Sequence, residues 1–262
     1  MTEQFDFTTT EAVQQPGRTG HSGQTGDHSG QVFGEDVRAD AREIIDRYPE
    51  SRSALLPLLH LVQSVQGQVT PEGMDFCAEL LALSAAEVSA VATFYTMYKR
   101  EPCGQHLVSV CTNTLCAALG GDAIYKMLSE RLGVGHEQTA GEPGEPGSIT
   151  LEHAECLAAC DFAPVLQVNY EYYDNQTEGS ALDLVEALRR GERPNPTRGA
   201  PLTDFRGAER QLAGFFEEGG EQAMDGPSAA EETVRGARIA AERGWTAPPM
   251  PDDAELPPAP EK

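Results

Sequence analysis

The chain has 262 residues, a formal net charge of −23 and only 39% hydrophobic residues, alongside 26 Gly and 18 Pro. The length accommodates two ordinary domains, and the low hydrophobic share indicates flexible ends around a well-packed middle. The negative charge opposes binding to phosphate backbones and anionic lipid surfaces, so we expect no nucleic-acid partner and no direct membrane contact.

Both ends of the chain have compositions typical of disorder. Residues 1–34 form a leader rich in Gly, Ser, Thr and Gln, which cannot bury enough apolar surface to fold. Residues 193–262 are expected to be a linker followed by an acidic, Pro/Gly-rich tail. Within it a short helix near 228–243 fits the pattern, and Trp245 is a docking candidate, although a solvated tail is the simpler interpretation. The start lacks the features of a signal peptide and no apolar run could span a bilayer, which predicts a cytoplasmic protein.

Residues 35–100 have the pattern of a helical domain. Four helices are expected: near 36–48, near 51–67 with Ser51 or Ser53 as N-cap, from Thr70, and from Ser84 to about Tyr98. Pro follows Thr70 at the first helical position, and Ser84 with Glu87 makes a capping box. The apolar stripe of the last helix predicts a bundle core; it comprises Val88, Val91, Tyr95 and Tyr98.

Residues 101–192 change to the pattern of an α/β domain. A strand at 106–110 leads directly into Cys111, and a second strand at 148–154 leads into Cys156. The other expected elements are a helix at 117–132, a loop over 133–147, a strand pair at 165–169 and 171–174, and a closing helix at 180–190. The order β-α-β-β-β-α indicates a thioredoxin-like domain. The predicted fold class is therefore α+β: an N-terminal helical bundle followed by a thioredoxin-like α/β domain, with disordered tails at both ends.

Four cysteines occur as two tight pairs, Cys111 with Cys116 and Cys156 with Cys160. Four thiolates on two loops are what an iron–sulfur cluster or a structural zinc ion requires. The spacings C-x4-C and C-x3-C fit poorly to zinc ribbons, whose pairs are C-x2-C, and better to a [2Fe–2S] cluster with one iron per pair. Disulfides are a third alternative, disfavoured in a reducing compartment. We therefore take these four residues as the metal ligands and expect no catalytic residue.

The other cysteines and a nearby histidine are weaker candidates. Cys77 falls within a helix and Cys103 lies outside either pair, so both are interpreted as non-ligands. His153 precedes Cys156 closely and could hydrogen-bond a cluster, although a strand histidine without that role is the simpler interpretation. Residues 112–114 are expected to donate hydrogen bonds to sulfur, and the apolar residues 157–159 to shield it from water.

Three longer segments accompany these pairs: YPESRSALLPLLHLVQ, LSAAEVSAVATFYTMY and ECLAACDFAPVLQVN. With the cysteine spacing, they make residues 36–190 resemble the thioredoxin-like [2Fe–2S] subunit of NADH:quinone oxidoreductase, the E subunit of the bacterial respiratory complex I. The resemblance implies one [2Fe–2S] cluster on Cys111, Cys116, Cys156 and Cys160. It also implies a partner flavoprotein that carries FMN and the NADH site, within a multisubunit membrane complex on whose cytoplasmic side this chain would lie peripherally.

The sequence contains no Gly-rich nucleotide fingerprint after a strand, which agrees with NADH binding on another subunit. We therefore expect an oxidoreductase subunit that exchanges single electrons with the flavin and has no complete active site of its own. The module also resembles the small subunits of NAD-dependent formate dehydrogenases and NAD-linked hydrogenases. Two functions of other kinds stay open: a zinc-stapled structural adaptor and a free-standing thioredoxin-like ferredoxin.

Overall fold

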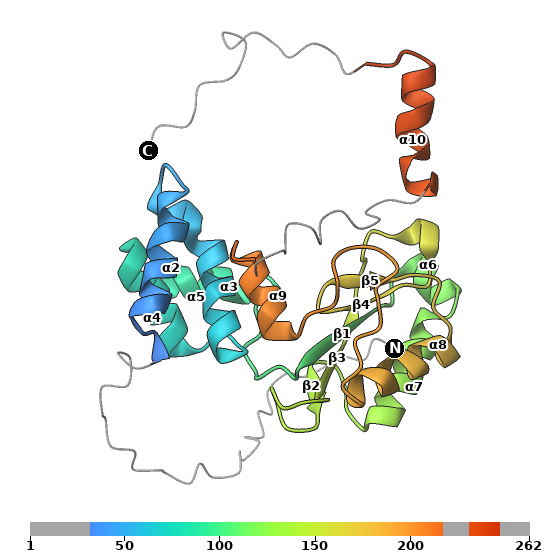
Figure 1. Cartoon of the computed structure of the whole chain (residues 1–262), viewed down its shortest axis with the longest axis horizontal. Coiled ribbons are helices and arrows are strands. Elements are labelled where there is room, and N and C mark those ends of the chain that lie inside the picture. Colours follow the sequence, from blue (N-terminus) through green and yellow to red (C-terminus); the bar gives the residue numbers. More distant parts are fainter. Residues whose placement is uncertain (1–31, 217–230, 247–262) are drawn as a thin grey trace, which may run out of the picture.

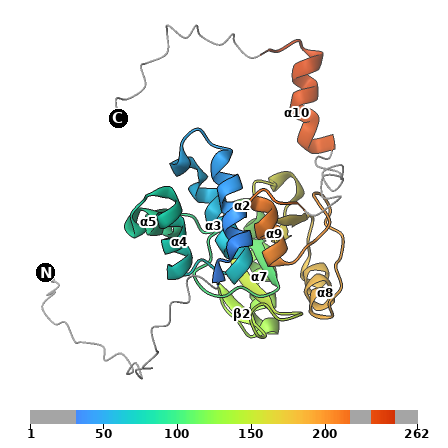
Figure 2. The ribbon, with the colours of Figure 1, turned by 60° about the vertical axis from the view of Figure 1, so that its left-hand side comes forward.

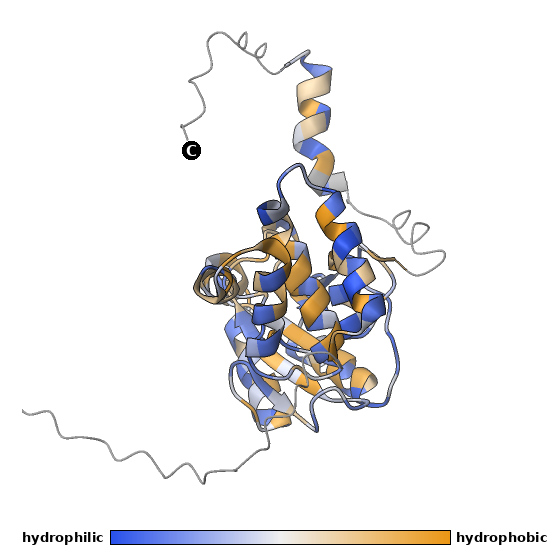
Figure 3. Ribbon diagram, turned by 90° about the vertical axis from the view of Figure 1, so that its left-hand side faces the viewer, coloured by the Kyte–Doolittle hydropathy of each residue, from blue (hydrophilic) through white to orange (hydrophobic). Residues whose placement is uncertain are grey.

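In the computed structural model, residues 32–216 and 231–246 are described. A helical region and a five-stranded sheet with its own helices lie next to each other, and a late helix, α9 (Phe205–Leu212), lies against the helical region (Figures 1 and 2). Hydrophobic residues gather where these elements pack together (Figure 3). None of the helices within the described ranges is long and apolar enough to cross a membrane.

The helical region contains the four predicted helices. They are α2 (Glu35–Asp46), α3 (Leu55–Gln66) after a 3-10 turn at Ser51–Ala54, α4 (Pro71–Leu81) and α5 (Ala85–Phe94). The Thr70 hydroxyl accepts a hydrogen bond from the Gly73 N–H at 3.0 Å, and Ser84 forms the predicted capping box with Glu87. Gly67 ends α3 in the left-handed conformation with φ +73°, which glycine adopts without steric cost.

Helix α3 is the centre of this region. Seven of its twelve residues are buried, because α2, α4, α5 and α9 all contact it. Phe33 is also buried in this core, where its ring stacks on that of Phe76 with centroids 4.4 Å apart. The sequence predicts Phe33 and Gly34 as part of the disordered leader, but the Phe33 side chain has a site in the core. Residues 1–31 lie outside the described ranges.

Two predicted details of the helices are wrong. Neither Ser51 nor Ser53 caps α3, since both lie in the 3-10 turn that precedes it. The last helix ends at Phe94 and does not reach Tyr98. The buried amide of Gln63 explains this early end, because it donates to the Met97 carbonyl at 3.0 Å and accepts from the Lys99 N–H at 2.6 Å. Tertiary hydrogen bonds thus override the helical pattern of the sequence.

The sheet has the strand order β2-β3-β1-β4-β5. Its strands are β1 (His106–Cys111), β2 (Gln138–Ala140), β3 (Ile149–Ala154), β4 (Leu166–Val168) and β5 (Glu171–Tyr173). Strands β1 and β3 are parallel, and the other neighbours are antiparallel. Helices α7 (Gly121–Leu132) and α8 (Glu178–Arg189) pack on one face, against the alternating buried residues of β1, β3 and β4.

Two features of the sheet region differ from the prediction. The helix expected at 117–132 is divided into α6 (Thr114–Ala118) and α7, because Gly120 has φ +114° and breaks the helical path. The loop expected over 133–147 contains the edge strand β2, whose three residues are too few for a visible period-two pattern.

The C-terminal segment is ordered further than predicted. Helix α9 buries Phe205 against Leu107 on the sheet face opposite α7 and α8. The fully buried Glu209 carboxylate accepts from Tyr170 Oη at 2.8 Å and lies 2.6 Å from His60 Nδ1 on α3, so α9 bonds to both regions. The sequence predicts that residues 205–212 lie in the tail, but they belong to the packed fold, because these polar and apolar contacts offset the cost of ordering.

A second helix of this segment, α10 (Glu231–Glu242), agrees with the short helix predicted near 228–243 and stands apart from the fold (Figures 1 and 2). Trp245 is 62% exposed, and the Arg243 guanidinium carbon lies 5.1 Å from its ring centroid. The rest of the predicted tail, 217–230 and 247–262, lies outside the described ranges.

Candidate metal centre

The fold brings the two cysteine pairs to the same edge of the sheet. Cys111 is the last residue of β1, and Cys156 follows the last residue of β3, Ala154, by two positions. These strands are parallel, with Cys111 opposite Ala154. Because the carboxyl ends of parallel strands meet at one edge, the loops after β1 and β3 start side by side, as the sequence predicts.

The first pair is buried and held by the backbone. Cys111 and Cys116 are each only 2% exposed, and the Cys111 N–H donates to the Val165 carbonyl at 3.1 Å. Gly121, the first residue of α7, lies so close that a Cβ there would be 2.4 Å from the Cys111 carbonyl oxygen and 2.9 Å from that of Cys116. The N-terminus of α7, the positive end of its dipole, therefore abuts this loop, where it favours thiolates.

The second pair is exposed and held by side chains as well as by the backbone. Between Cys156 and Cys160, Ala158 has φ +55°, a left-handed conformation that costs energy for a residue with a Cβ. This conformation directs the Ala158 N–H towards Cys156 Sγ, at 3.4 Å. Tyr172 on β5 donates its hydroxyl proton to the Leu157 carbonyl at 2.7 Å, which ties the loop to the sheet.

The thiols of Cys116 and Cys160 are affected by neighbouring cysteines. Burial raises the pKa of Cys116 to about 11; the adjacent Cys111 and Cys160 thiols add to this increase, while the Val165 backbone opposes it. The pKa of Cys160 is raised by its hydrogen bond to Cys156, with a smaller contribution from Cys111. These shifts agree with cysteines of both pairs lying near one another, as the meeting of the two loops at one sheet edge indicates.

This donor set fits a [2Fe–2S] cluster. Each iron of such a cluster takes two cysteine thiolates, and the site offers two pairs of thiols with a backbone N–H directed at one sulfur. An apolar group surrounds the buried pair and includes Ala159, Val165, Leu157, Phe162 and Tyr172. Among the described residues, no group of three or more His, Cys, Asp and Glu side chains is arranged to hold a single metal ion.

Cys77 and Cys103 lie elsewhere. Cys77 belongs to the core of the helical region, and Cys103 contacts Leu107 and Phe205 at the opposite end of β1 from Cys111. Burial raises the pKa of both thiols to about 12, so each stays protonated at neutral pH. Their positions agree with the interpretation that they are not ligands.

The predicted supporting residues are only partly placed as expected. The His153 ring packs on His136, with centroids 4.2 Å apart, and on Tyr125, which agrees with the simpler interpretation of a strand histidine. The Thr112 hydroxyl donates to the Ala154 carbonyl at 3.3 Å, so it braces the loop instead of serving a sulfur atom. The sequence predicts that residues 157–159 shield the site together, but the left-handed Ala158 turns outward and is exposed, while its two neighbours are covered.

Sequence reasoning missed the residues that hold these loops from a distance. Gly121 supports the first loop from the start of the next helix, and Tyr172 supports the second loop from strand β5; neither belongs to a cysteine motif. The Gly-Gly dipeptide after Leu119 was the available signal for the break before α7, whereas nothing in the sequence distinguishes the Tyr172 hydroxyl from its neighbours.

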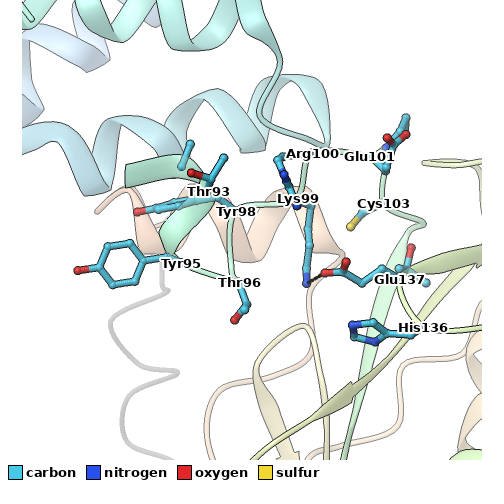
Figure 4. A pocket seen from close by; sticks show the side chains of 13 residues that line it. Thr93, Tyr95, Thr96, Tyr98, Lys99, Arg100, Glu101, Cys103, His136 and Glu137 are labelled. Atoms are coloured by element: carbon cyan, nitrogen blue, oxygen red, sulfur yellow. Dashed lines mark hydrogen bonds and ion pairs between the residues drawn. The ribbon is translucent and has the colours of Figure 1, made fainter. Parts of the chain in front are cut away.

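A polar bridge joins the helical region to the sheet beside this site. The buried Lys99 pairs with Glu137 at 3.2 Å and with Glu152, whose other oxygen accepts from the Ser109 hydroxyl at 2.6 Å. A cavity of about 420 Å³ lies on one side of this bridge (Figure 4), and another of about 480 Å³ reaches Cys156. Because each charge in this bridge has a partner, we assign the bridge a structural role: it holds the helical region against the sheet.

The fold and the donor set place this protein in the class of metalloproteins that bind metal through cysteine thiolates at the edge of a thioredoxin-like sheet. Residues 41–189 match the model of the thioredoxin-like [2Fe-2S] ferredoxin family, and the chain belongs to this family. The predicted resemblance, fold class and [2Fe–2S] cofactor are thereby confirmed, whereas the four individual ligands stay predictions.

The similar curated proteins are named as the E subunit of NADH-quinone oxidoreductase. The one from Mycobacterium tuberculosis (strain ATCC 25618 / H37Rv) is 54% identical over 215 residues, 82% of this chain and 83% of the relative. That from Rickettsia conorii (strain ATCC VR-613 / Malish 7) is 38% identical over 57% of this chain and 89% of the relative. Any stretch of 215 residues in this chain contains α9. The similarity to the Mycobacterium tuberculosis protein therefore extends beyond residues 41–189, which the family model matches.

Two solved structures are distant matches. An NAD+-reducing [NiFe]-hydrogenase in the air-oxidized state shares 15% identity over 51% of this chain and 23% of that chain, with a TM-score of 0.45. A thioredoxin-like [2Fe-2S] ferredoxin from Aquifex aeolicus shares 19% identity over 34% of this chain and 84% of that chain, with a TM-score of 0.27.

Proposed function

We propose that this chain is the electron-transfer subunit of the NADH dehydrogenase module of an NADH:quinone oxidoreductase. Single electrons pass between the FMN of a partner flavoprotein and a [2Fe–2S] cluster held by Cys111, Cys116, Cys156 and Cys160. The observation that carries this proposal is the meeting of two thiol pairs at one sheet edge, in a chain 54% identical to a protein named as the E subunit of NADH-quinone oxidoreductase.

When bound, the cluster supplies one-electron redox chemistry at an energy set by its surroundings. The residues of this chain hold it and adjust that energy. The buried pair and its apolar neighbours exclude water on one side, and the N-terminus of α7 provides positive potential beside Cys111 and Cys116. The Ala158 N–H stabilises negative charge on the sulfur of Cys156.

The exposed side of the site is the expected contact with the electron donor. Cys156 and Cys160 are exposed. Two exposed leucines lie close to Cys116 in the chain: Leu115 on α6, which is 45% exposed, and Leu119 just after α6, which is 56% exposed. An apolar surface next to a redox centre brings a protein partner close enough for electron transfer. We propose that the flavoprotein covers these leucines, and that the assembly places this chain peripherally on the cytoplasmic side of a membrane complex.

One experiment tests both parts of this function. The full chain is purified anaerobically, reduced with dithionite, freed of excess reductant and mixed with the oxidised flavoprotein isolated from the same complex. Freeze-quenched EPR spectra should show the cluster signal disappearing as a flavin semiquinone appears, because the cluster loses one electron and the flavin gains it. Persistence of the cluster signal would overturn the proposal.

Variants of the exposed leucines separate docking from chemistry. L115E and L119E should slow the electron transfer at least tenfold without altering the EPR spectrum of the isolated chain. The matched control is F94E, which changes a 78% exposed aromatic residue on the helical region and should leave the rate unchanged. Subunits that co-purify with a tagged chain distinguish this complex from the alternatives: a hydrogenase or formate dehydrogenase partner would contradict the assignment to a quinone oxidoreductase.

A further inference from the structure

The segment after α8 places an arginine over the aromatic residues that hold the second cysteine loop. The guanidinium carbon of Arg198 lies 4.3 Å from the ring centroid of Tyr172 and 5.3 Å from that of Phe162. Phe162 follows Cys160 by two residues, and the Tyr172 hydroxyl donates to the Leu157 carbonyl. The Arg198 guanidinium therefore contacts both aromatic rings beside this loop, that of Phe162, which follows the loop, and that of Tyr172, which is bonded to it.

The backbone around Arg198 is fixed to the edge of the sheet. The Thr197 N–H donates to the Tyr172 carbonyl at 2.8 Å, and the Ala200 N–H donates to a Glu171 carboxylate oxygen at 3.0 Å. Between them, Gly199 has φ +103°, and a Cβ there would lie 1.9 Å from the same Glu171 oxygen. The segment thus covers the edge strand β5, and the position of Arg198 does not depend on its side chain alone.

The charge of Arg198 is partnered and shielded from water. Its Nη2 donates to one Asp174 oxygen at 3.1 Å, and its Nε lies 3.1 Å from the other oxygen without the angle of a hydrogen bond. The side chains of Arg198 and Asp174 are 14% and 10% exposed. A pair with so little solvent contact exerts a field on its surroundings that water screens only weakly.

We propose that Arg198 is a positioning residue for the loop of Cys156 and Cys160, and that the charges of Arg198 and Asp174 act on the reduction potential of the cluster in opposite, balancing directions. This inference rests on the proposed function. The guanidinium fixes Tyr172 and Phe162, which in turn fix the loop. Its positive charge stabilises the extra negative charge of the reduced cluster, and Asp174 opposes this effect. Residues 197–200 lie outside the residues that the family model matches, whereas Phe162, Tyr172 and Asp174 lie within them.

The test is a set of variants of the full chain, purified anaerobically, whose cluster EPR signal is followed in a redox titration. R198Q should lower the midpoint potential because Asp174 is left uncompensated. D174N should raise it, and the R198Q/D174N double variant should return close to the wild-type value. R198K keeps the charge but cannot stack as a plane or form the same fork, so its potential should stay near wild type while a chelator removes iron several times faster.

The control is R190Q, which removes the same charge from an exposed pair at the end of α8 and should change neither property. Equal potentials for R198Q, D174N and the wild type would overturn the inference. So would equal rates of iron removal from R198K and the wild type. A wild-type chain without a [2Fe–2S] signal would instead refute the proposed function, so the two failures are distinguishable.

Discussion

The two cysteine loops of this protein are supported in opposite ways. In the first loop both cysteines, Cys111 and Cys116, are buried, although residues 113–115 between them are exposed. This loop continues a central strand and packs against the backbone of α7 at Gly121. The loop of Cys156 and Cys160 is exposed, contains a left-handed alanine, and is tied to the sheet by the Tyr172 side chain. The cysteines of the first loop are thus held like core residues, whereas the second loop depends on a few side chains that reach it from outside.

This difference assigns the loops different tasks. Two buried cysteines on a loop held by the backbone give the cluster a fixed position on its inner side. An exposed loop leaves part of the cluster near the surface, where an electron can enter from a partner. Apart from the cysteines themselves, changes to the packing of the first loop are therefore expected to act on stability, and changes around the second loop on cluster retention.

The largest effect is expected from substitution of the cysteines. C111S, C116S, C156S and C160S should each lose or severely degrade the cluster, because each removes one of two ligands to an iron atom. C77S and C103S should keep it, since these thiols lie in separate cores. Iron and sulfide analysis with EPR checks the series. Equal loss in all six variants would show that the cysteines are wrongly divided into ligands and non-ligands.

Removal of the metal should expose the contrast between the loops directly. In the apoprotein at pH 8, iodoacetamide should modify Cys156 and Cys160 first, because they are exposed. Cys77 and Cys103 should react last, because burial raises their pKa to about 12 and leaves a thiolate fraction of about 10⁻⁴. Mass spectrometry of peptides gives the order. Modification of Cys111 and Cys116 as fast as the exposed pair would contradict the described asymmetry.

A smaller effect is expected where α7 meets the first loop. G121A adds a Cβ that would lie 2.4 Å from the Cys111 carbonyl oxygen, so backbone atoms must shift. We expect a loss of about 1–3 kcal/mol in the free energy of unfolding, measured by urea denaturation. The matched control is G179A in the first turn of α8, where the nearest atom is 3.8 Å away and little change should follow. Equal stabilities of the two variants would argue against close packing at Gly121.

The smallest effect is expected from a single hydroxyl. Y172F removes the hydrogen bond to Leu157, and Y173F removes one of the same 2.7 Å length to Pro194 from the next residue of β5. Each should cost about 1 kcal/mol of stability. Only Y172F should accelerate iron removal by a chelator, because only its partner lies in a cysteine loop. Equal rates for the two variants would show that the Tyr172 hydroxyl does not support the second loop.

Local patterns in the sequence predict the elements that carry their own signals. The capping residues Thr70 and Ser84 mark their helices correctly, and the strand before each cysteine pair places both pairs at one sheet edge. These features depend on neighbouring residues, so the sequence contains them in full. The same holds for the thiol spacing that favours an iron–sulfur cluster over zinc.

Contacts between distant residues could not be predicted in this way. The early end of α5 depends on Gln63, the burial of α9 on a pair between Glu209 and His60, and the second loop on Tyr172. Each of these interactions joins residues that are at least 15 positions apart, and no periodicity marks them. The Pro- and Gly-rich composition around Arg198 is typical of a linker, and only the sheet edge beside it gives that segment a fixed conformation.

The most direct test of a [2Fe–2S] cluster on these four cysteines is metal and sulfide analysis of the full chain. The protein is purified anaerobically, iron, zinc and acid-labile sulfide are measured per chain, and EPR is recorded after one-electron reduction. We expect a red-brown protein with two iron atoms and two sulfides per chain and a cluster signal on reduction. One zinc atom per chain, without sulfide or colour, would contradict it.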